Sequence, residues 1–531
     1  MAKESSKFGK YFNLPNPGLR TYFDRVRSGQ PDEYRTPFSK GESVQSVLSA
    51  WDRILKPVRA DWPTLYEFEN DLRSKVGPMS VMKPLSERMT DIDNYYDLIS
   101  KDQTTFMPEA VDRTVREWGR GIKSIRNEKD VVAIMKKSTN SGSPFFTKRK
   151  LVTNKTIPCY VDPNDGDTLQ YLGNKATEWG ACAVLGWRGQ EGGPSKDDVK
   201  QRVVWMFPYA VNIQELRVYQ PLIEYAQRYK IVPAWVSMDC VDEEITRLFD
   251  TKGKDDLIIC TDFSKFDQHF NHSCQDAAKQ VLTALLPDGV DARAWLEDVF
   301  PIKYNIPLAY DWEKVRFGAH GMASGSGGTN ADETLTHRTL QHEAAIKSNA
   351  KLNPHSQCLG DDGILSYPGI TVDDVMQTYT AHGLDMNPDK QYVSKQDCVY
   401  LRRWHHKDYR DDRGICVGVY STFRALGRLM EQERYYDPDV WSAKMVALRQ
   451  LSIIENCKYH PYREQFAKFC MKRDKYRLGI DIPGFLENID SIAQEATDYM
   501  PDFLGYTKSL AKDADTGLSN WWIVKYLKSH A

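Results

Sequence analysis

The chain lacks the features that mark secreted, membrane-inserted and zinc-binding proteins. None of its 531 residues belong to an uninterrupted apolar stretch approaching the roughly 18 residues of a membrane span. The start, Met1-Ala2-Lys3-Glu4-Ser5, is unlike a signal peptide. The ten cysteines occur singly, without a CxxC pair or a Cys/His series at zinc-ligand spacing. We therefore expect a chain that is neither secreted nor membrane-inserted, with reduced thiols and no zinc site.

The chain also lacks an excess of charge of one sign. Its formal net charge of -2 does not mark the whole chain as a nucleic-acid binder. The local distribution is uneven, because nine basic residues lie between Lys123 and Lys155 against only Glu128 and Asp130. Such a run is either a solvated basic face or part of a groove that follows a phosphate backbone.

Internal repeats and low-complexity tracts are absent too, which favours one interwoven body over a string of independent domains. The middle of the chain alternates strand-like and helix-like segments, and the last third is mainly helical in pattern. Asp437-Pro438 predicts a helix start, followed by apolar residues at helical spacing from Trp441 to Leu448. The apolar segment 521–524 predicts a C-terminal tail that docks on the body.

The most informative segment that is present is Gly360-Asp361-Asp362, between two short apolar runs at 356–359 and 363–367. This pattern predicts a tight hairpin with two adjacent carboxylates at its tip. Such carboxylates repel each other unless a cation neutralises them. An ordinary Asp-rich turn is the alternative, because Asp and Gly favour turns for local backbone reasons.

A second acidic position follows the strand-like run 256–261, whose carboxyl end carries Asp262. If Asp262 and Asp361 come together, they can clamp two divalent ions about 3.5 to 4 Å apart. Oxygen ligands without a Cys/His cage favour Mg2+ or Mn2+ over zinc. Whether the two strands are neighbours does not follow from the sequence.

A run of small residues, 321–330, precedes a segment with helical character at 331–348. Small residues allow a backbone loop to approach a substrate closely. A flexible linker is the alternative, although a linker seldom lies between a strand and a helix start. Asn330 and Glu333 also fit a helix N-cap with a side chain reaching back from the third position.

Together these segments resemble motifs A, B and C of the viral RNA-dependent RNA polymerases, in order and in spacing. The matching residues are Asp262-x4-Asp267, Ser324-Gly325-x3-Thr329 and Gly360-Asp361-Asp362. Four further segments resemble motifs G, F, D and E: Thr139-x2-Gly142-x-Pro144, Lys200-Gln201-Arg202, 386–390 and 400–403. The sequences at 13–20 and 203–208 are most similar to those of the picobirnavirus polymerases, from viruses with a segmented double-stranded RNA genome.

The resemblance implies an α+β, right-hand polymerase fold with fingers, a palm of antiparallel sheet and helices, and a helical thumb, closed by fingertips. The implied division is an N-terminal extension at 1–60, fingers at 61–227, palm at 228–275 with motif A, a fingers insertion at 276–318, palm at 319–404 with motifs B to E, and thumb and tail at 405–531.

The resemblance also implies roles in catalysis. Asp262 and Asp361 would bind two Mg2+ or Mn2+ ions, with Asp362 assisting or orienting. Lys390 would donate a proton to the pyrophosphate, its alternative being an exposed lysine at a helix end.

Nucleotide-binding roles are implied for the residues of motifs F, A and B. Lys200 and Arg202 would grip the triphosphate, and Asp267 would sense the ribose 2'-hydroxyl. Ser324, Gly325 and Thr329 would hold the template and the nascent pair. The chain departs from a common pattern, because Glu333 stands where many relatives have Asn; Asn330 is therefore our candidate for the missing amide.

RNA contacts are implied for Thr139 and Gly142 in motif G and for Arg402 and Arg403 in motif E. The alternative for the two arginines is a structural basic strand.

The expected partners are template and nascent RNA, NTPs and a viral capsid protein, with no membrane. The enzyme would act as a monomer in the virion interior and the host cytoplasm, and the polar stretch 511–519 would form an initiation platform. Two alternatives stay open: a reverse transcriptase, against which Gly360 and the motif B pattern argue, and a non-catalytic RNA-binding protein of the capsid.

Overall fold

The computed structural model describes residues 9, 11–12, 17–100, 103–164, 167–173, 177–499 and 517–531. Two predicted features lie partly outside this range. They are residues 13–16 of the picobirnavirus-like segment 13–20, and residues 511–516 of the expected initiation platform. Within the described range, each helix is too short or too polar to cross a bilayer. All ten cysteines are described, and each is a buried thiol outside any disulfide.

The chain forms two compact units. The first comprises residues 1–29, 83–187 and 203–398, and the second comprises 30–82, 188–202 and 399–531. Strands β5, β6 and β13 run from one unit into the other. The six-part division into extension, fingers, palm and thumb stays a prediction.

The first unit contains the following elements: α2 (Pro17–Ser28), η1 (Leu85–Glu87), α6 (Met89–Asp97), α7 (Pro108–Glu117), α8 (Glu128–Ile134), α9 (Arg149–Thr156), β2 (Cys159–Asn164), β3 (Asp167–Leu172), β4 (Thr177–Gly180), β5 (Ala183–Gln190), β6 (Lys200–Met206), α10 (Tyr209–Arg228), α11 (Pro233–Val236), α12 (Met238–Thr251), β7 (Ile258–Thr261), α13 (Phe266–His269), α14 (His272–Leu285), α15 (Val290–Asp298), η3 (Phe300–Tyr304), β8 (Leu308–Asp311), β9 (Lys314–Arg316), α16 (Thr329–Lys347), β10 (Gln357–Leu359), β11 (Asp362–Leu365), α17 (Val372–Thr380), η4 (Pro388–Lys390), β12 (Tyr392–Ser394) and β13 (Asp397–Tyr400).

The second unit contains β1 (Tyr34–Arg35), α3 (Val44–Leu55), α4 (Val58–Asp61), α5 (Pro63–Lys75), η2 (Lys196–Asp198), β14 (Arg403–His406), β15 (Val419–Tyr420), α18 (Thr422–Met430), β16 (Glu431–Gln432), α19 (Ala443–Glu455), α20 (Arg463–Arg473), η5 (Arg477–Gly479), α21 (Ile489–Tyr499), η7 (Leu518–Asn520) and α23 (Trp522–Ser529).

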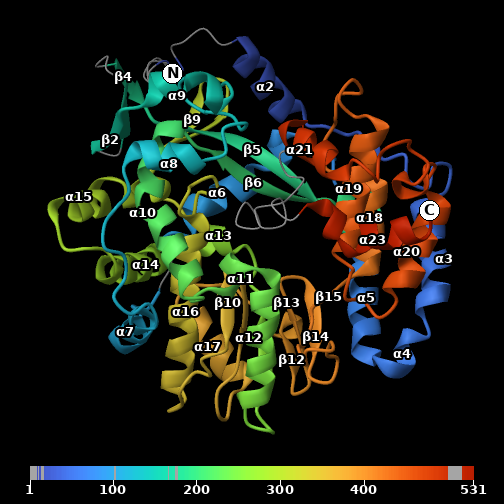
Figure 1. Ribbon diagram of the computed structural model, residues 1–531. Coiled ribbons are helices and arrows are strands. Elements are labelled where there is room, and N and C mark those ends of the chain that lie inside the picture. Colours follow the sequence, from blue (N-terminus) through green and yellow to red (C-terminus); the bar gives the residue numbers. More distant parts are fainter. Residues whose placement is uncertain are drawn as a thin grey trace. The chain divides into compact units, whose positions relative to one another are not determined.

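A four-stranded antiparallel sheet in the first unit carries both acidic segments. Its strand order is β10-β11-β7-β12. The central strand β7 is buried along its whole length, as its apolar sequence predicts. Helices α12, α16 and α17 lie beside this sheet (Figure 1), and Gln357 of β10 donates to the Val241 carbonyl of α12 at 3.2 Å. This is the antiparallel sheet with helices that the motifs predicted.

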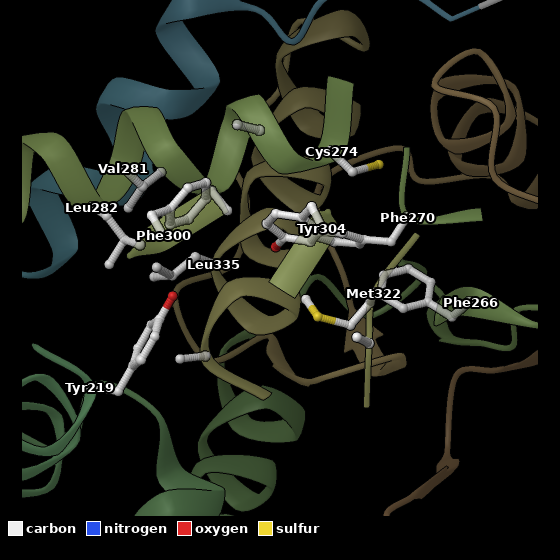
Figure 2. Close-up of a cluster of buried hydrophobic side chains, with 14 of the residues drawn as sticks. Tyr219, Phe266, Phe270, Cys274, Val281, Leu282, Phe300, Tyr304, Met322 and Leu335 are labelled. Atoms are coloured by element: carbon white, nitrogen blue, oxygen red, sulfur yellow. The ribbon is translucent and has the colours of Figure 1, made fainter. Parts of the chain in front are cut away.

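Two other sheets have the strand orders β2-β3-β4 and β6-β5-β8-β9. The main core of the unit lies where α10, α14, η3 and α16 meet. Figure 2 shows Tyr219, Phe300, Tyr304 and Leu335 pointing toward one another within this cluster. The core therefore joins segments that the sequence had assigned to fingers and to palm.

The second unit is mainly helical, as its sequence pattern predicted, with Trp51, Phe423, Leu448 and Phe466 in its core. The C-terminal tail docks as expected. Ile523 of α23 is fully buried, and the backbone N–H groups at the start of α23 donate to the Glu455 carboxylate at 3.1 and 2.9 Å.

One predicted helix start was wrong, and one alternative helix cap is not formed. Helix α19 begins at Ala443, because Ser442 caps it by accepting from the Met445 N–H, and Asp437 instead forms a turn with Asp439. Helix α16 begins at Thr329 after Gly328, without a side-chain cap. Asn330 therefore does not cap this helix, and its side-chain oxygen accepts from Trp235 Nε1 at 2.7 Å.

Candidate active site

The acidic residues of motifs A and C lie at the same end of the palm sheet. Strands β7 and β11 pair in antiparallel register, with Thr261 opposite Gly363, so Asp262 and Asp362 follow at the next position. Leu359 pairs with Asp362, which makes Gly360-Asp361 the two-residue loop of the predicted hairpin. Gly360 has φ +57, a value that glycine tolerates at such a loop. The side chains of Asp262 and Asp361 are exposed, and Asp362 is half-buried.

The backbone of Asp262 is held by Gln391, a residue that our sequence analysis missed. The Asp262 N–H donates to Gln391 Oε1 at 2.8 Å, and Gln391 Nε2 donates to the Asp262 carbonyl at 2.9 Å. Gln391 follows η4 and precedes β12, which pairs with β7. The one signal in the sequence was its position directly after Lys390 of motif D.

Helix α16 holds the hairpin tip from the other side. The Gly360 N–H donates to Thr334 Oγ1 at 2.9 Å, and His337 Nδ1 donates to the Gly360 carbonyl at 2.8 Å. Burial lowers the pKa of His337 to about 4, so its ring is neutral at physiological pH. Sequence reasoning gave neither residue a role, because both look like ordinary core positions of a helix.

The sugar-sensing residue proposed for motif A, Asp267, lies beside Glu333 of α16. Glu333 is buried, and its Oε1 has no hydrogen-bond donor near it among the described residues. Burial raises the pKa of Glu333 well above its ordinary value, and the neighbouring Asp267 carboxylate raises it further. The raised pKa favours the form of Glu333 that can donate a hydrogen bond to Asp267, and the nucleotide contact of Asn330 stays a prediction.

The motif B loop crosses tightly packed backbone. A side-chain carbon at Gly325 would lie 1.6 Å from the Trp205 carbonyl oxygen, so only glycine fits there. Ser324 Oγ donates to the Val203 carbonyl at 3.3 Å, and Thr329 Oγ1 donates to the Ala323 carbonyl at 3.2 Å. Ser324, Gly325 and Thr329 are each half-buried, which leaves part of the loop accessible.

The remaining predicted residues of the first unit are spread around this region. Lys390 is exposed at the end of η4. Gly142 is buried against the Phe207 backbone with φ +60, and Thr139 is half-buried before it.

The second unit gathers basic residues in a cavity of about 230 Å³. Arg202 and Arg402 both line it, together with three further arginines and with Glu191 and Glu433. Arg402 stands in the two-residue loop between β13 and β14 with φ 60, a left-handed conformation that non-glycine residues adopt only at a cost of roughly 1–3 kcal/mol. Burial lowers the pKa of Arg402, and the nearby guanidinium groups of Arg424 and Arg202 lower it further.

Two basic residues of the second unit differ in exposure. Lys200 is exposed, in agreement with a contact to a ligand. Arg403 is buried, and its Nη2 donates to the Gly418 carbonyl at 3.3 Å. A guanidinium that is enclosed and bonded to protein backbone is not presented to a phosphate. The structure therefore favours the structural alternative for Arg403 over the predicted RNA contact.

The carboxylates of motifs A and C suit a hard divalent cation. Among the residues that the structure describes, no three His, Cys, Asp or Glu side chains gather into a complete metal cluster. Magnesium usually takes one or two protein carboxylates and fills its other positions with water and substrate phosphates. The exposed carboxylates of Asp262 and Asp361 fit that incomplete protein set.

The sheet, its paired acidic residues and the glycine-rich loop before α16 are the parts of a polymerase palm. Residues 105–435 match the family of viral RNA-dependent RNA polymerases. The chain belongs to that family, and it is an RNA-directed RNA polymerase rather than a reverse transcriptase or a non-catalytic capsid protein.

Within the family, the chain is similar to proteins of human picobirnavirus. It is 64% identical to a potential RNA-dependent RNA polymerase of that virus over 532 residues, which cover 98% of each chain. A crystal structure of the RNA-dependent RNA polymerase of a human picobirnavirus matches with a TM-score of 0.94 at 63% identity. An insertion-loop deletion mutant matches with a TM-score of 0.93 at 61% identity. Both structural matches cover 99% of each chain. The expected right-hand fold and the picobirnavirus resemblance are thereby confirmed.

Proposed function

We propose that Asp262 and Asp361 are the catalytic metal ligands with which this polymerase transfers nucleotides to RNA, and that Asp362 orients them. The observation that carries this proposal is the register of β7 and β11, which brings residues 99 positions apart in the sequence to one end of the sheet. Enzymes of this family use divalent metal ions. We assign two ions, Mg2+ or Mn2+, because the donors are carboxylate oxygens.

When bound, the ions lower the pKa of the primer 3'-hydroxyl and neutralise charge on the transferred phosphoryl group and the pyrophosphate. The protein keeps the two carboxylates in place. Gln391 fixes the backbone of Asp262, while Thr334 and His337 fix the turn that carries Asp361.

Recognition of the ribose is assigned to Asp267 together with Glu333. A carboxylate at Asp267 accepts a hydrogen bond from the 2'-hydroxyl, which is the group that separates NTP from dNTP. Glu333 orients Asp267 by donating to it, as supported by their adjacency. Ser324, Gly325 and Thr329 hold the template and the nascent pair. Asn330 is the candidate for the amide contact to the nucleotide, and its amide nitrogen lies 3.7 Å from where a side-chain carbon at Gly360 would be.

Basic residues supply contacts to phosphates. Arg202 and Lys200 grip the triphosphate, since Arg offers a planar fork of donors and Lys a point charge. Arg402 contacts RNA, and Thr139 and Gly142 contact the template. Lys390 donates a proton to the pyrophosphate, which its exposed position next to Gln391 supports.

The test of the metal ligands is a primer-extension assay with NTP and dNTP, using Asp262→Asn, Asp361→Asn and a matched surface variant, Asp373→Asn, in the first turn of α17. The first two variants should lose at least about 100-fold in NTP incorporation, the order of loss when an electrostatic group of an active site is removed. Asp373→Asn should keep wild-type activity. NTP incorporation retained by Asp361→Asn would overturn the assignment.

For the setting of the reaction, we propose a monomeric enzyme that acts on template and nascent RNA within the virion interior and the host cytoplasm, next to a capsid protein. The family supports RNA and NTPs as the substrates. Light scattering of the purified chain tests the monomer, and co-purification with the viral capsid protein tests that partner.

A further inference from the structure

Three adjoining residues of the motif B loop are attached to one face of α10. Asn212 Nδ2 donates to the Gly325 carbonyl at 3.2 Å. Ser326 Oγ donates to Glu215 Oε2, and the Gly327 N–H donates to Glu215 Oε1 at 3.1 Å. Asn212 and Glu215 lie three positions apart on the helix and so share a face. They also bond to each other, at 3.0 Å.

Glu215 has no exposed surface, so its charge depends on these donors. Burial raises the pKa of Glu215, and the Lys303 ammonium together with the donors from Ser326, Gly327 and Asn212 oppose that rise. A buried carboxylate that loses its donors is strongly destabilising. A shift of the loop away from α10 would break these bonds and leave Glu215 in that state, so the bonds favour the observed loop conformation.

The first turn of α16, which follows the loop, is also anchored by α10. Asp332 of α16 accepts from the Tyr219 hydroxyl at 2.7 Å and from the Tyr304 hydroxyl at 2.6 Å, and pairs with Lys303 at 3.0 Å. Figure 2 shows the Tyr219 and Tyr304 hydroxyls pointing into the cluster. Tyr219 lies one turn beyond Glu215 on α10. Helix α10 therefore fixes the motif B loop at its middle and at its end.

We infer that Glu215 is a positioning residue for nucleotide selection: through Ser326 and Gly327 it fixes the motif B loop that presents Ser324, Gly325 and Thr329 to the nascent pair. The inference rests on the roles proposed above for those three residues. Glu215 itself touches no substrate, since it is enclosed by α10 and the loop. A loop that is held less firmly presents the incoming nucleotide in a less uniform geometry, which lowers the rate of the chemical step.

A positioning role and a merely structural role predict different measurements. Loss of folded enzyme lowers incorporation of NTP and dNTP by the same factor. A displaced loop also shifts Glu333, one turn along α16 from Thr329, and so weakens the proposed contact to the 2'-hydroxyl, which only NTP carries. The informative quantity is therefore the ratio of kcat/KM for NTP to kcat/KM for dNTP, measured by single-nucleotide primer extension. The variants are Glu215→Gln, Ser326→Ala and the double variant. Thr156→Val in α9 is the matched control, because it removes a buried hydroxyl whose hydrogen bond among the described residues stays within its own helix, to the Val152 carbonyl at 2.7 Å.

We expect each single variant to lower the NTP/dNTP ratio about tenfold, the effect of one hydrogen bond to a charged group. The losses should be less than multiplicative in the double variant, because the two side chains share the Ser326–Glu215 hydrogen bond. Thr156→Val should leave the ratio unchanged. A ratio unchanged in Ser326→Ala, or losses that multiply in the double variant, would overturn the inference.

Two further outcomes are decisive. If Glu215→Gln does not fold, Ser326→Ala alone decides, since removing one hydroxyl disturbs the fold least. If the wild-type chain incorporates no NTP, the proposed polymerase chemistry fails; if it incorporates NTP while the ratios stay unchanged, only the role of Glu215 fails.

Discussion

Replacing Gln391 with Leu should slow catalysis without unfolding the protein. The change keeps the side chain's size and removes both hydrogen bonds to the Asp262 backbone, which measure 2.8 and 2.9 Å. Each such bond contributes roughly 1 kcal/mol net, so the two together restrain Asp262 by about 2 kcal/mol. If that restraint is needed in the transition state, kcat falls about 30-fold.

The assay is single-nucleotide extension of an RNA primer-template at saturating NTP, repeated over a series of magnesium concentrations. Because Gln391 holds Asp262, a proposed metal ligand, the concentration of Mg2+ that gives half-maximal rate should rise together with the loss in kcat. Gln396→Leu is the matched control, since Gln396 is exposed and its described hydrogen bond uses its backbone N–H. A Gln391→Leu enzyme with wild-type kcat and wild-type magnesium dependence would refute the reasoning.

Three further predictions concern packing, the triphosphate and the sugar. Gly363→Ala places a carbon 2.6 Å from the buried His337 ring, so the free energy of unfolding measured by urea denaturation should fall by roughly 1–3 kcal/mol. Gly289→Ala, in open space, should leave that free energy unchanged. Arg202→Ala should lower kcat/KM for all four NTPs, and a defect confined to one base in steady-state kinetics would contradict a triphosphate contact. Asp267→Ala should relax discrimination against dNTP in competition assays, and unchanged selectivity would move that role to other residues.

The residues that carry chemistry were predictable, because short motifs keep them at fixed spacing. Asp262 and Asp361 were identified from an apolar run followed by an acidic residue and from a hairpin pattern. Their proximity was not predictable from the residues alone, since it depends on the pairing of β7 with β11. The family resemblance supplied that step, and the register confirmed it.

The residues that hold the motifs in place were not predictable. Gln391 is 129 positions from Asp262, and a glutamine after a lysine has no distinctive pattern. Glu333 looked like a departure from the family pattern, with Asn330 as the candidate for the missing amide, because the sequence does not show that Glu333 is buried beside Asp267. The raised pKa of Glu333 depends on that burial, which only the folded chain creates.

Helix α16 explains why a Gly-Asp-Asp tripeptide alone does not define an active site. This helix is enclosed on nearly all sides, so each of its polar side chains needs a partner. Those partners are the functional segments themselves: Asp332 binds the α10 network, Glu333 adjoins Asp267, and Thr334 and His337 bind Gly360. Because a helix fixes the spacing of its side chains, Asp267 and the turn that carries Asp361 are held at a set separation. The position of the hairpin tip is thus determined by the buried polar residues of α16 as much as by its own sequence.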